Sequence, residues 1–186
     1  MKRLLLTANG FGKENLRSNF FGLIEKKPEN IIAIFATAIN DFNSSEMLPE
    51  YLNNLLELGI LREHIYVYNF DQNIAYNRFL NTDVVFVHGN DPKYLWSRIR
   101  ATQNIKKLNK YIKEGGFYVG INAGSIVISN MFDNAPEDYL TFLNCKLTIG
   151  GKHGIEIGEF YPNEHQSINL SNNCAIKIHD NKFEVI

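Results

Sequence analysis

Short apolar runs alternate with longer amphipathic segments over the first two thirds of the chain. The apolar runs predict five buried strands, at Arg3–Thr7, Ile31–Phe35, His64–Tyr68, Val84–Val87 and Phe117–Gly120. Strands that are apolar along their whole length are typical of a parallel sheet whose two faces are both covered by helices. The pattern therefore predicts a three-layer α/β fold with a mostly parallel sheet.

The segments between these strands predict the covering helices. We expect them at Glu14–Glu25, Glu46–Leu58, Ile74–Phe79 and Lys93–Lys113, the last with a break around Thr102–Asn104. In the second helix, an apolar face at helical spacing is assigned to the core. It consists of Leu48, Tyr51, Leu52, Leu55 and Leu58.

The last third of the chain changes character. A short buried helix is expected over Ser125–Asn130, and strand-like alternation begins at Phe142. Ala175–His179 and Lys182–Ile186 flank Asp180 and Asn181, two residues that tolerate the positive φ of a tight hairpin turn. We expect this part to extend the sheet in antiparallel fashion at its C-terminal end, which gives a flavodoxin-like or Rossmann-like architecture.

Length and composition narrow the class of protein. A chain of 186 residues with 45% hydrophobic residues and no linker-like stretch favours one domain over residues 1–186. A net charge of −1, without a block of either sign, argues against nucleic acid as a partner. No apolar run approaches the ~18 residues of a membrane span. With two cysteines and no signal-peptide pattern, we expect a cytoplasmic location and no membrane association.

The loops that follow two of the strands carry the candidate chemistry. In an open α/β sheet, ligands bind outside the carboxyl ends of the strands. Gly115–Val127 reads as a buried strand, a turn of small residues and a helix. This is the layout of a nucleophile elbow, in which the amide after the nucleophile points at a developing oxyanion.

Four segments, in order, resemble the dipeptidase E (α-aspartyl dipeptidase) family of serine peptidases, which has a class I glutamine amidotransferase-like fold. They are the opening Lys2–Phe11, the Val85–Asn90 stretch ahead of Tyr94 and Leu95, the Tyr118–Ser125 elbow and the closing Lys182–Ile186. The resemblance implies a serine nucleophile at the elbow, a histidine base, an acidic residue that orients the histidine, and small aspartyl peptides as substrates.

The chain departs from that pattern at the nucleophile position, which holds Asn122. A carboxamide has no hydroxyl to deprotonate, so it cannot form the acyl-enzyme. Asn does suit the elbow, because it is enriched at positive φ. By the resemblance, His153 matches the base, with His165 as the second choice, and Glu137 or Asp138 is the acid candidate.

The remaining site candidates surround the elbow. Gly89, Asn90, Ala123 and His88 are expected to form the oxyanion and substrate-binding surface. Asp91 would place a carboxylate close to that surface. A structural alternative is that Asp91 and Pro92 simply cap the next helix, since this order is the favoured one.

Three functions remain open at this point. The first is a family member that has lost hydrolysis and binds a small acidic or peptide-like ligand. The second is an active hydrolase of aspartyl dipeptides with a rearranged nucleophile, for which Ser125 is the candidate, although its hydroxyl is better placed to cap or back-bond the helix start. The third is an interaction domain whose cleft is vestigial, filled by side chains such as Tyr118, Tyr94 or Tyr161.

We expect no cofactor and no metal, since the histidines lack metal-binding spacing, and the sequence leaves a homodimer open.

Overall fold

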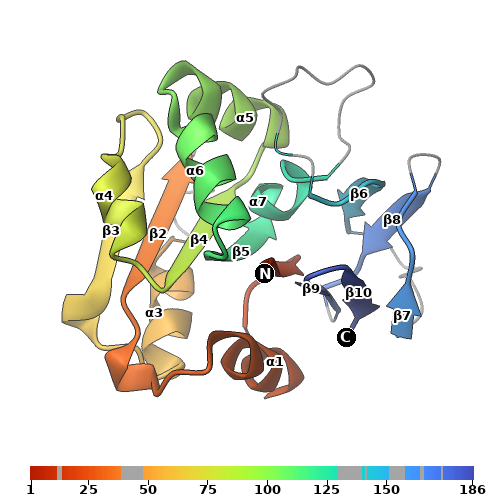
Figure 1. Cartoon of the computed structure of the whole chain (residues 1–186), viewed down its shortest axis with the longest axis horizontal. Helices are drawn as coiled ribbons and strands as arrows, with labels where there is room; N and C mark the ends of the chain where they lie inside the picture. The colour runs from red at the N-terminus through yellow and green to blue at the C-terminus, as the bar shows by residue number, and fades with distance from the viewer. Residues whose placement is uncertain are drawn as a thin grey trace.

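A computed structural model describes residues 1–11, 14–38, 48–129, 140, 142–150, 158–163, 166–172 and 174–186. Its centre is an eight-stranded sheet with the order β3-β2-β4-β5-β1-β9-β10-β7 (Figure 1). The strands are β1 (Arg3–Thr7), β2 (Ala33–Ala38), β3 (Ile65–Asn69), β4 (Val84–Gly89), β5 (Phe117–Asn122), β7 (Gly158–Phe160), β9 (Ala175–His179) and β10 (Lys182–Val185). The strands from β3 to β1 are mutually parallel, and β9, β10 and β7 add antiparallel pairs.

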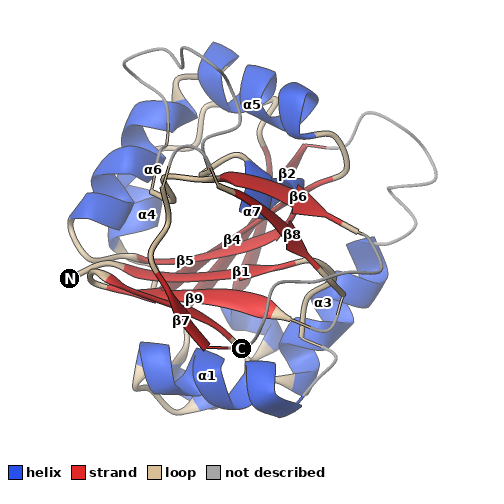
Figure 2. Cartoon of the chain, turned by 90° about the vertical axis from the view of Figure 1, so that its right-hand side faces the viewer, coloured by secondary structure: helices blue, strands red, loops and turns tan. Residues whose placement is uncertain are grey.

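Helices cover both faces of this sheet, as Figure 2 shows. The helices on one face are α1 (Glu14–Ile24) and α3 (Leu48–Glu57). Those on the other face are α4 (Tyr76–Leu80), α5 (Pro92–Ala101), α6 (Asn104–Lys113) and α7 (Ala123–Ile126). Short 3₁₀ turns lie at Pro28–Asn30 and Arg62–His64. The predicted three-layer α/β architecture with an antiparallel C-terminal extension is therefore confirmed.

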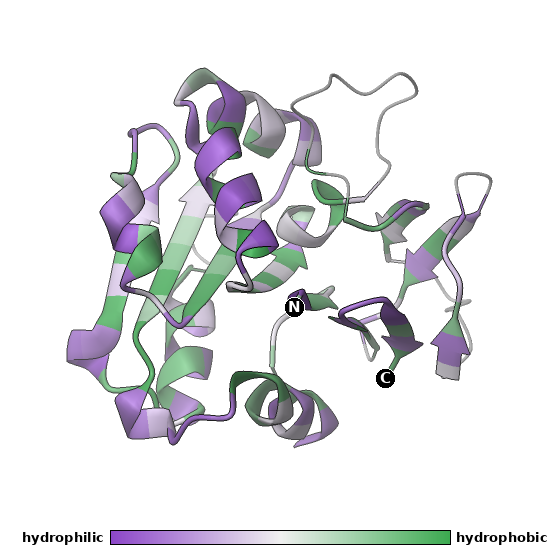
Figure 3. Cartoon of the chain, in the orientation of Figure 1, coloured by the Kyte–Doolittle hydropathy of each residue, from purple (hydrophilic) through white to green (hydrophobic). Residues whose placement is uncertain are grey.

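Burial of the central strands explains why the sheet forms. All six residues of β2 and all six of β4 are buried, which is the environment that continuous apolar runs require. Figure 3 shows these strands mainly in the colour of hydrophobic residues, while the outer helices also carry hydrophilic positions. Two buried clusters, one on each face, make up the core.

Some of the predicted turns and element boundaries are confirmed, and others differ in the structure. The break between α5 and α6 is confirmed, with Gln103 in the left-handed region at φ 59°. The hairpin β9–β10 is also confirmed, with Asp180 at φ 56°. The helix predicted at Ser125–Asn130 instead spans Ala123–Ile126, because β5 runs on to Asn122 and the chain turns there.

Two further predictions need correction. β6 (Lys146–Ile149) and β8 (Ser167–Leu170) do not extend the central sheet but pair in parallel as a separate two-stranded sheet. In α3, Leu48 and Leu52 are only partly buried, whereas Tyr51 and Leu55 are in the core. The apolar face of α3 is therefore wider than the sheet surface that it covers.

No described helix is both long enough and apolar enough to cross a membrane.

Candidate functional site

The candidate site lies where the parallel strands end. The strand register pairs Gly89 at the end of β4 with Asn122 at the end of β5, and Gly89 with Ala38 on β2. Thr7 at the end of β1 pairs with Ile121. These adjacent strand ends form one edge of the sheet, which is the edge where open α/β folds bind ligands.

Asn122 holds an unusual backbone conformation at this edge. Its φ is 53° and its ψ is −119°, and its side chain is half-buried. These angles are those of the first central residue of a type II′ turn, a position that Gly, Asn and Asp favour. For a residue with a Cβ, such a conformation costs on the order of 1–3 kcal/mol and persists only where the surroundings impose it.

Two glycines impose that turn. A Cβ on Gly124 would lie 1.8 Å from the carbonyl oxygen of Val87, and a Cβ on Gly120 would lie 2.7 Å from the Cα of Ser125. Neither distance is compatible with a side chain, so α7 can pack directly on the backbone of β4 and β5 only because both positions are glycine. The chain reverses sharply at Asn122 as a result.

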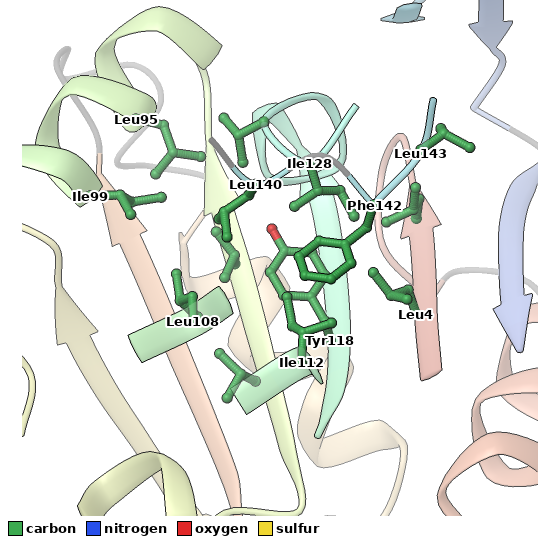
Figure 4. Close-up of a cluster of buried hydrophobic side chains, with 14 of the residues drawn as sticks. Leu4, Leu95, Ile99, Leu108, Ile112, Tyr118, Ile128, Leu140, Phe142 and Leu143 are labelled. Atoms are coloured by element: carbon green, nitrogen blue, oxygen red, sulfur yellow. The ribbon is translucent and has the colours of Figure 1, made fainter. Parts of the chain in front are cut away.

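Buried hydrogen bonds hold the turn from both sides. The Tyr118 hydroxyl donates to the Gly124 carbonyl oxygen at 2.7 Å, and the Ser125 hydroxyl donates to the Thr7 carbonyl oxygen at 2.8 Å. Figure 4 shows Tyr118 among apolar side chains with its oxygen pointing toward α7. The expectation that Ser125 caps or back-bonds the start of its own helix is wrong, because its hydroxyl bonds to β1.

Thr7 also holds this edge of the sheet together, and the sequence pattern did not point to it. Its hydroxyl donates to the Gly120 carbonyl oxygen at 3.3 Å and accepts a hydrogen bond from the Gly10 N–H at 3.1 Å. Gly10 has a φ of 82°. A threonine at a strand end followed three residues later by glycine is the signal that could have indicated this turn.

His88 lies in the sheet beside this edge and is 2% exposed. Its Nδ1 is 3.4 Å from the Thr37 hydroxyl, and its ring centroid is 4.4 Å from that of Tyr51 on α3. Burial lowers the pKa of His88 to about 4, because the charged imidazolium would lose its hydration. The ring is therefore neutral near pH 7, and its side chain packs on the α3 face of the sheet.

The turn after β4 combines close packing with a helix cap. A Cβ on Gly89 would lie 3.1 Å from the Ala38 carbonyl oxygen and 3.2 Å from a methyl carbon of Leu95. Asp91 accepts hydrogen bonds from the backbone N–H groups of Lys93 and Tyr94, at 2.8 and 3.1 Å, and Pro92 begins α5. The structural alternative for Asp91, a helix cap, is confirmed. Asn90 is half-buried between Gly89 and this cap.

The predicted base and acid lie outside the described residues. They are His153 and Glu137, and the second choices His165 and Asp138 lie outside them as well. The structure thus brings together Asn122, Ala123 and Gly89, with Asn90 adjacent, and shows His88 facing α3. In the described part of the chain, no group of three or more His, Cys, Asp or Glu side chains is placed to hold a metal ion.

Comparisons with known proteins agree on the kind of fold. The sequence profile of peptidase family S51 matches residues 4–140. A solved structure assigned as a peptidase E protein of Listeria monocytogenes EGD-e superposes with a TM-score of 0.72 at 16% identity, covering 100% of this chain and 98% of that one. A peptidase from an acI-B1 actinobacterium gives a TM-score of 0.59 at 16% identity, covering 100% and 87%. A comparison with curated protein sequences finds no match.

Proposed function

Since the chain belongs to peptidase family S51, we propose that Asn122 occupies the position of the family's nucleophilic serine, and that the strand-end site therefore binds a small acidic or peptide-like ligand without hydrolysing it. The observation that carries this proposal is the backbone of Asn122, with φ 53° and ψ −119° between β5 and α7. A strained turn that the surroundings maintain at a ligand-binding edge is typical of a functional position.

The chemistry of the side chain decides against acyl transfer. A serine route needs an oxygen that loses its proton to a base and attacks the scissile carbonyl carbon. The Asn122 amide nitrogen is conjugated with its carbonyl, so its lone pair is not available for that attack. The family scaffold would then keep its recognition surface and lose the bond-forming atom.

The same edge offers groups that suit an amide or a carboxylate. The Ala123 N–H lies in the first turn of α7, where a backbone donor has no acceptor within the helix. The carboxamides of Asn122 and Asn90 can both donate and accept. The Asp91 carboxylate is engaged by two N–H groups of α5, which offsets part of its repulsion of an anionic ligand.

The contacts of Ser125 argue against the rearranged hydrolase. Ser125 is fully buried, and its hydroxyl already donates to the Thr7 carbonyl oxygen at 2.8 Å. A nucleophile must instead be exposed to substrate and within hydrogen-bond reach of a base. Two of the tyrosines named for a vestigial cleft have other places: Tyr118 is buried beneath the turn, where its hydroxyl bonds to the Gly124 carbonyl oxygen, and Tyr161 is 82% exposed.

The proposal is tested by restoring the hydroxyl. Purified native protein, Asn122→Ser and Asn122→Ser/His153→Ala are compared on aspartyl dipeptides and an aspartyl chromogenic amide. We expect the native protein to be inert and Asn122→Ser to gain at least about 100-fold over it, because a missing triad nucleophile costs several orders of magnitude. His153→Ala should remove that gain if His153 is the base.

Asn122→Gly is the matched control. Glycine keeps the positive φ but supplies no hydroxyl, so it should gain no activity, and calorimetry should show dipeptide binding weakened up to about tenfold by the loss of the carboxamide. Turnover by the native protein that survives Asn122→Gly and disappears in Ser125→Ala would establish the rearranged hydrolase instead. Absence of dipeptide binding by the native protein would favour the interaction domain.

A further inference from the structure

The turn at Asn122 aligns its side chain with the backbone nitrogen of the next residue. Around the Cα–C bond of an L-residue, Cβ stands about 120° from the residue's own nitrogen. The ψ of −119° at Asn122 therefore eclipses its Cβ with the nitrogen of Ala123. In helices and strands, where ψ is about −42° and about 115–135°, the same two atoms are rotated far apart. Asn122 thus holds a geometry that regular secondary structure excludes.

This eclipsed geometry is the one that a succinimide ring requires. Such a ring contains the Cα, Cβ and Cγ of one residue, its carbonyl carbon and the nitrogen of the next residue. These atoms lie nearly in one plane, so Cβ and the nitrogen must be eclipsed about the Cα–C bond. An asparagine has the length that closes the ring, because its carboxamide carbon follows directly on Cβ. The backbone of Asn122 is therefore preorganised for cyclisation.

The atoms that would react also have complementary chemistry. The Cγ of Asn122 is a carboxamide carbon, which a nitrogen can attack. Ala123 is the first residue of α7, directly after β5, so its N–H has no acceptor within that helix (Figure 1). Asn122 is only half-buried, so ammonia released there can escape to solvent.

The surrounding packing keeps the two residues in this arrangement. Gly120 and Gly124 allow α7 to lie directly on the backbone of β4 and β5. The Tyr118 hydroxyl bonds to the Gly124 carbonyl oxygen at 2.7 Å, and the Ser125 hydroxyl bonds to β1 at 2.8 Å. An unfolded chain reaches the eclipsed rotation only transiently, whereas the fold maintains it. Cyclisation should therefore be faster in the folded protein than in the unfolded chain.

We propose that Asn122 cyclises with Ala123 to a succinimide in the folded protein. The Ala123 nitrogen forms a bond to Cγ of Asn122, and the bond from Cγ to Nδ2 breaks. The proton of the Ala123 nitrogen passes through water to Nδ2, which leaves as ammonia. Water then opens the ring and leaves an aspartyl or isoaspartyl residue at position 122. No reactant other than water is needed.

Hydrolysis of the ring would change the strand-end site. It places a carboxylate at the edge where we propose that a small acidic or peptide-like ligand binds. Because like charges repel, the hydrolysed protein should bind an anionic ligand less tightly. This consequence rests on the proposed function, whereas formation of the ring does not, and the ring is measured without any ligand.

Asn9 supplies a comparison within the same chain. It precedes Gly10, whose lack of a side chain leaves the attacking nitrogen unhindered. Asn9 is exposed, but in the fold the Gly10 N–H donates to the Thr7 hydroxyl at 3.1 Å. In the unfolded chain Asn9 should therefore react faster than Asn122, and in the folded protein the order should reverse.

Peptide mass spectrometry of the full chain tests the proposal. The protein is incubated at mildly alkaline pH, either native or in guanidinium chloride, and fragmentation assigns the modified position. Position 122 should lose one ammonia, or become aspartyl or isoaspartyl, at least about tenfold faster in the native protein than in guanidinium chloride. Hydroxylamine attacks succinimides, so it should cut the native chain between Asn122 and Ala123.

Asn122→Gln and Asn9→Gln are the matched variants. Glutamine keeps the carboxamide, but its extra methylene prevents closure of the five-membered ring, so Asn122→Gln should abolish the cut and Asn9→Gln should leave it unchanged. Circular dichroism confirms that each variant is folded. Conversion at position 122 that is faster in guanidinium chloride than in the native protein would overturn the proposal. So would an unmodified position 122 in native protein incubated for as long as Asn9 needs to convert in guanidinium chloride.

Discussion

At the scale of single residues, local backbone geometry and burial give particular side chains unusual properties. Asn122 occupies a turn conformation that only a few residue types accept, with φ 53° and ψ −119°. His88 is an imidazole with 2% exposure between Tyr51 and Thr37. The residue type of Asn122 already fits its turn, whereas the neutral state of His88 follows only from the neighbours that bury its ring.

Burial of His88 predicts a specific loss of stability in acid. Its pKa is near 6.5 in the unfolded chain and about 4 in the fold, so between these values the unfolded state binds more protons. The stabilising effect of the neutral ring is complete above pH 6.5 and is lost as the pH falls to about 4, amounting to up to about 3 kcal/mol. Urea unfolding at several pH values measures this loss.

His88→Phe isolates the contribution of the imidazole from that of the carboxylates. Phenylalanine keeps an aromatic ring beside Tyr51 but does not titrate. The free energy of unfolding of the variant should therefore fall less steeply than that of the native protein between pH 6.5 and 4. Equal slopes for the two proteins would show that His88 is not the group responsible.

At the scale of elements, the junction of β5 with α7 depends on contacts that allow no side chain. Gly124 lies against the Val87 carbonyl oxygen of β4, and Gly120 lies against α7 itself. The short helix is also tied to β1 through Ser125 and to β5 through Tyr118. One four-residue helix thus connects three neighbouring strands at the candidate site.

Gly124→Ala should therefore be strongly destabilising. Its Cβ would be placed 1.8 Å from the Val87 carbonyl oxygen, so β4 or α7 must shift. We expect a loss of at least about 2–3 kcal/mol in the free energy of unfolding, measured by denaturant titration.

Gly22→Ala provides the comparison within the same protein. Gly22 lies inside α1, and a Cβ there would have no heavy atom within 4 Å. This substitution should stabilise the protein by about 0.5–1 kcal/mol through helix propensity. If both alanines had similar effects, the close packing of α7 on β4 would not be the cause of the glycine requirement.

At the scale of the whole molecule, the sheet separates two hydrophobic cores. Their residues come from nearly the full length of the chain. Cys145 belongs to the core on the α5 and α6 face, together with strands from both ends of the sequence. It is fully buried, and burial raises the pKa of its thiol to about 12. Cys174 is half-buried. Cys174 packs against the same core, so the two thiols differ in exposure and not in the core that they contact.

Thiol titration should show this difference. A disulfide reagent should modify Cys174 in the native protein, while Cys145 should react only when the core opens, because the thiolate is the reactive form. Cys174→Ser should leave no rapidly reacting thiol until denaturant is added. Rapid reaction of Cys145 in that variant would mean that this core is not closed.

The sequence by itself determined the α/β architecture, the parallel strands and the C-terminal hairpin, because continuous apolar runs and turn residues act locally. It also indicated the glycine-rich turn at Asn122 and the cap at Asp91. Only the tertiary structure decided where those groups face. The His88 ring lies against α3, Ser125 bonds to β1, and Leu48 and Leu52 of α3 are only partly buried. Such arrangements depend on contacts between residues far apart in the chain, which periodicity and spacing do not encode.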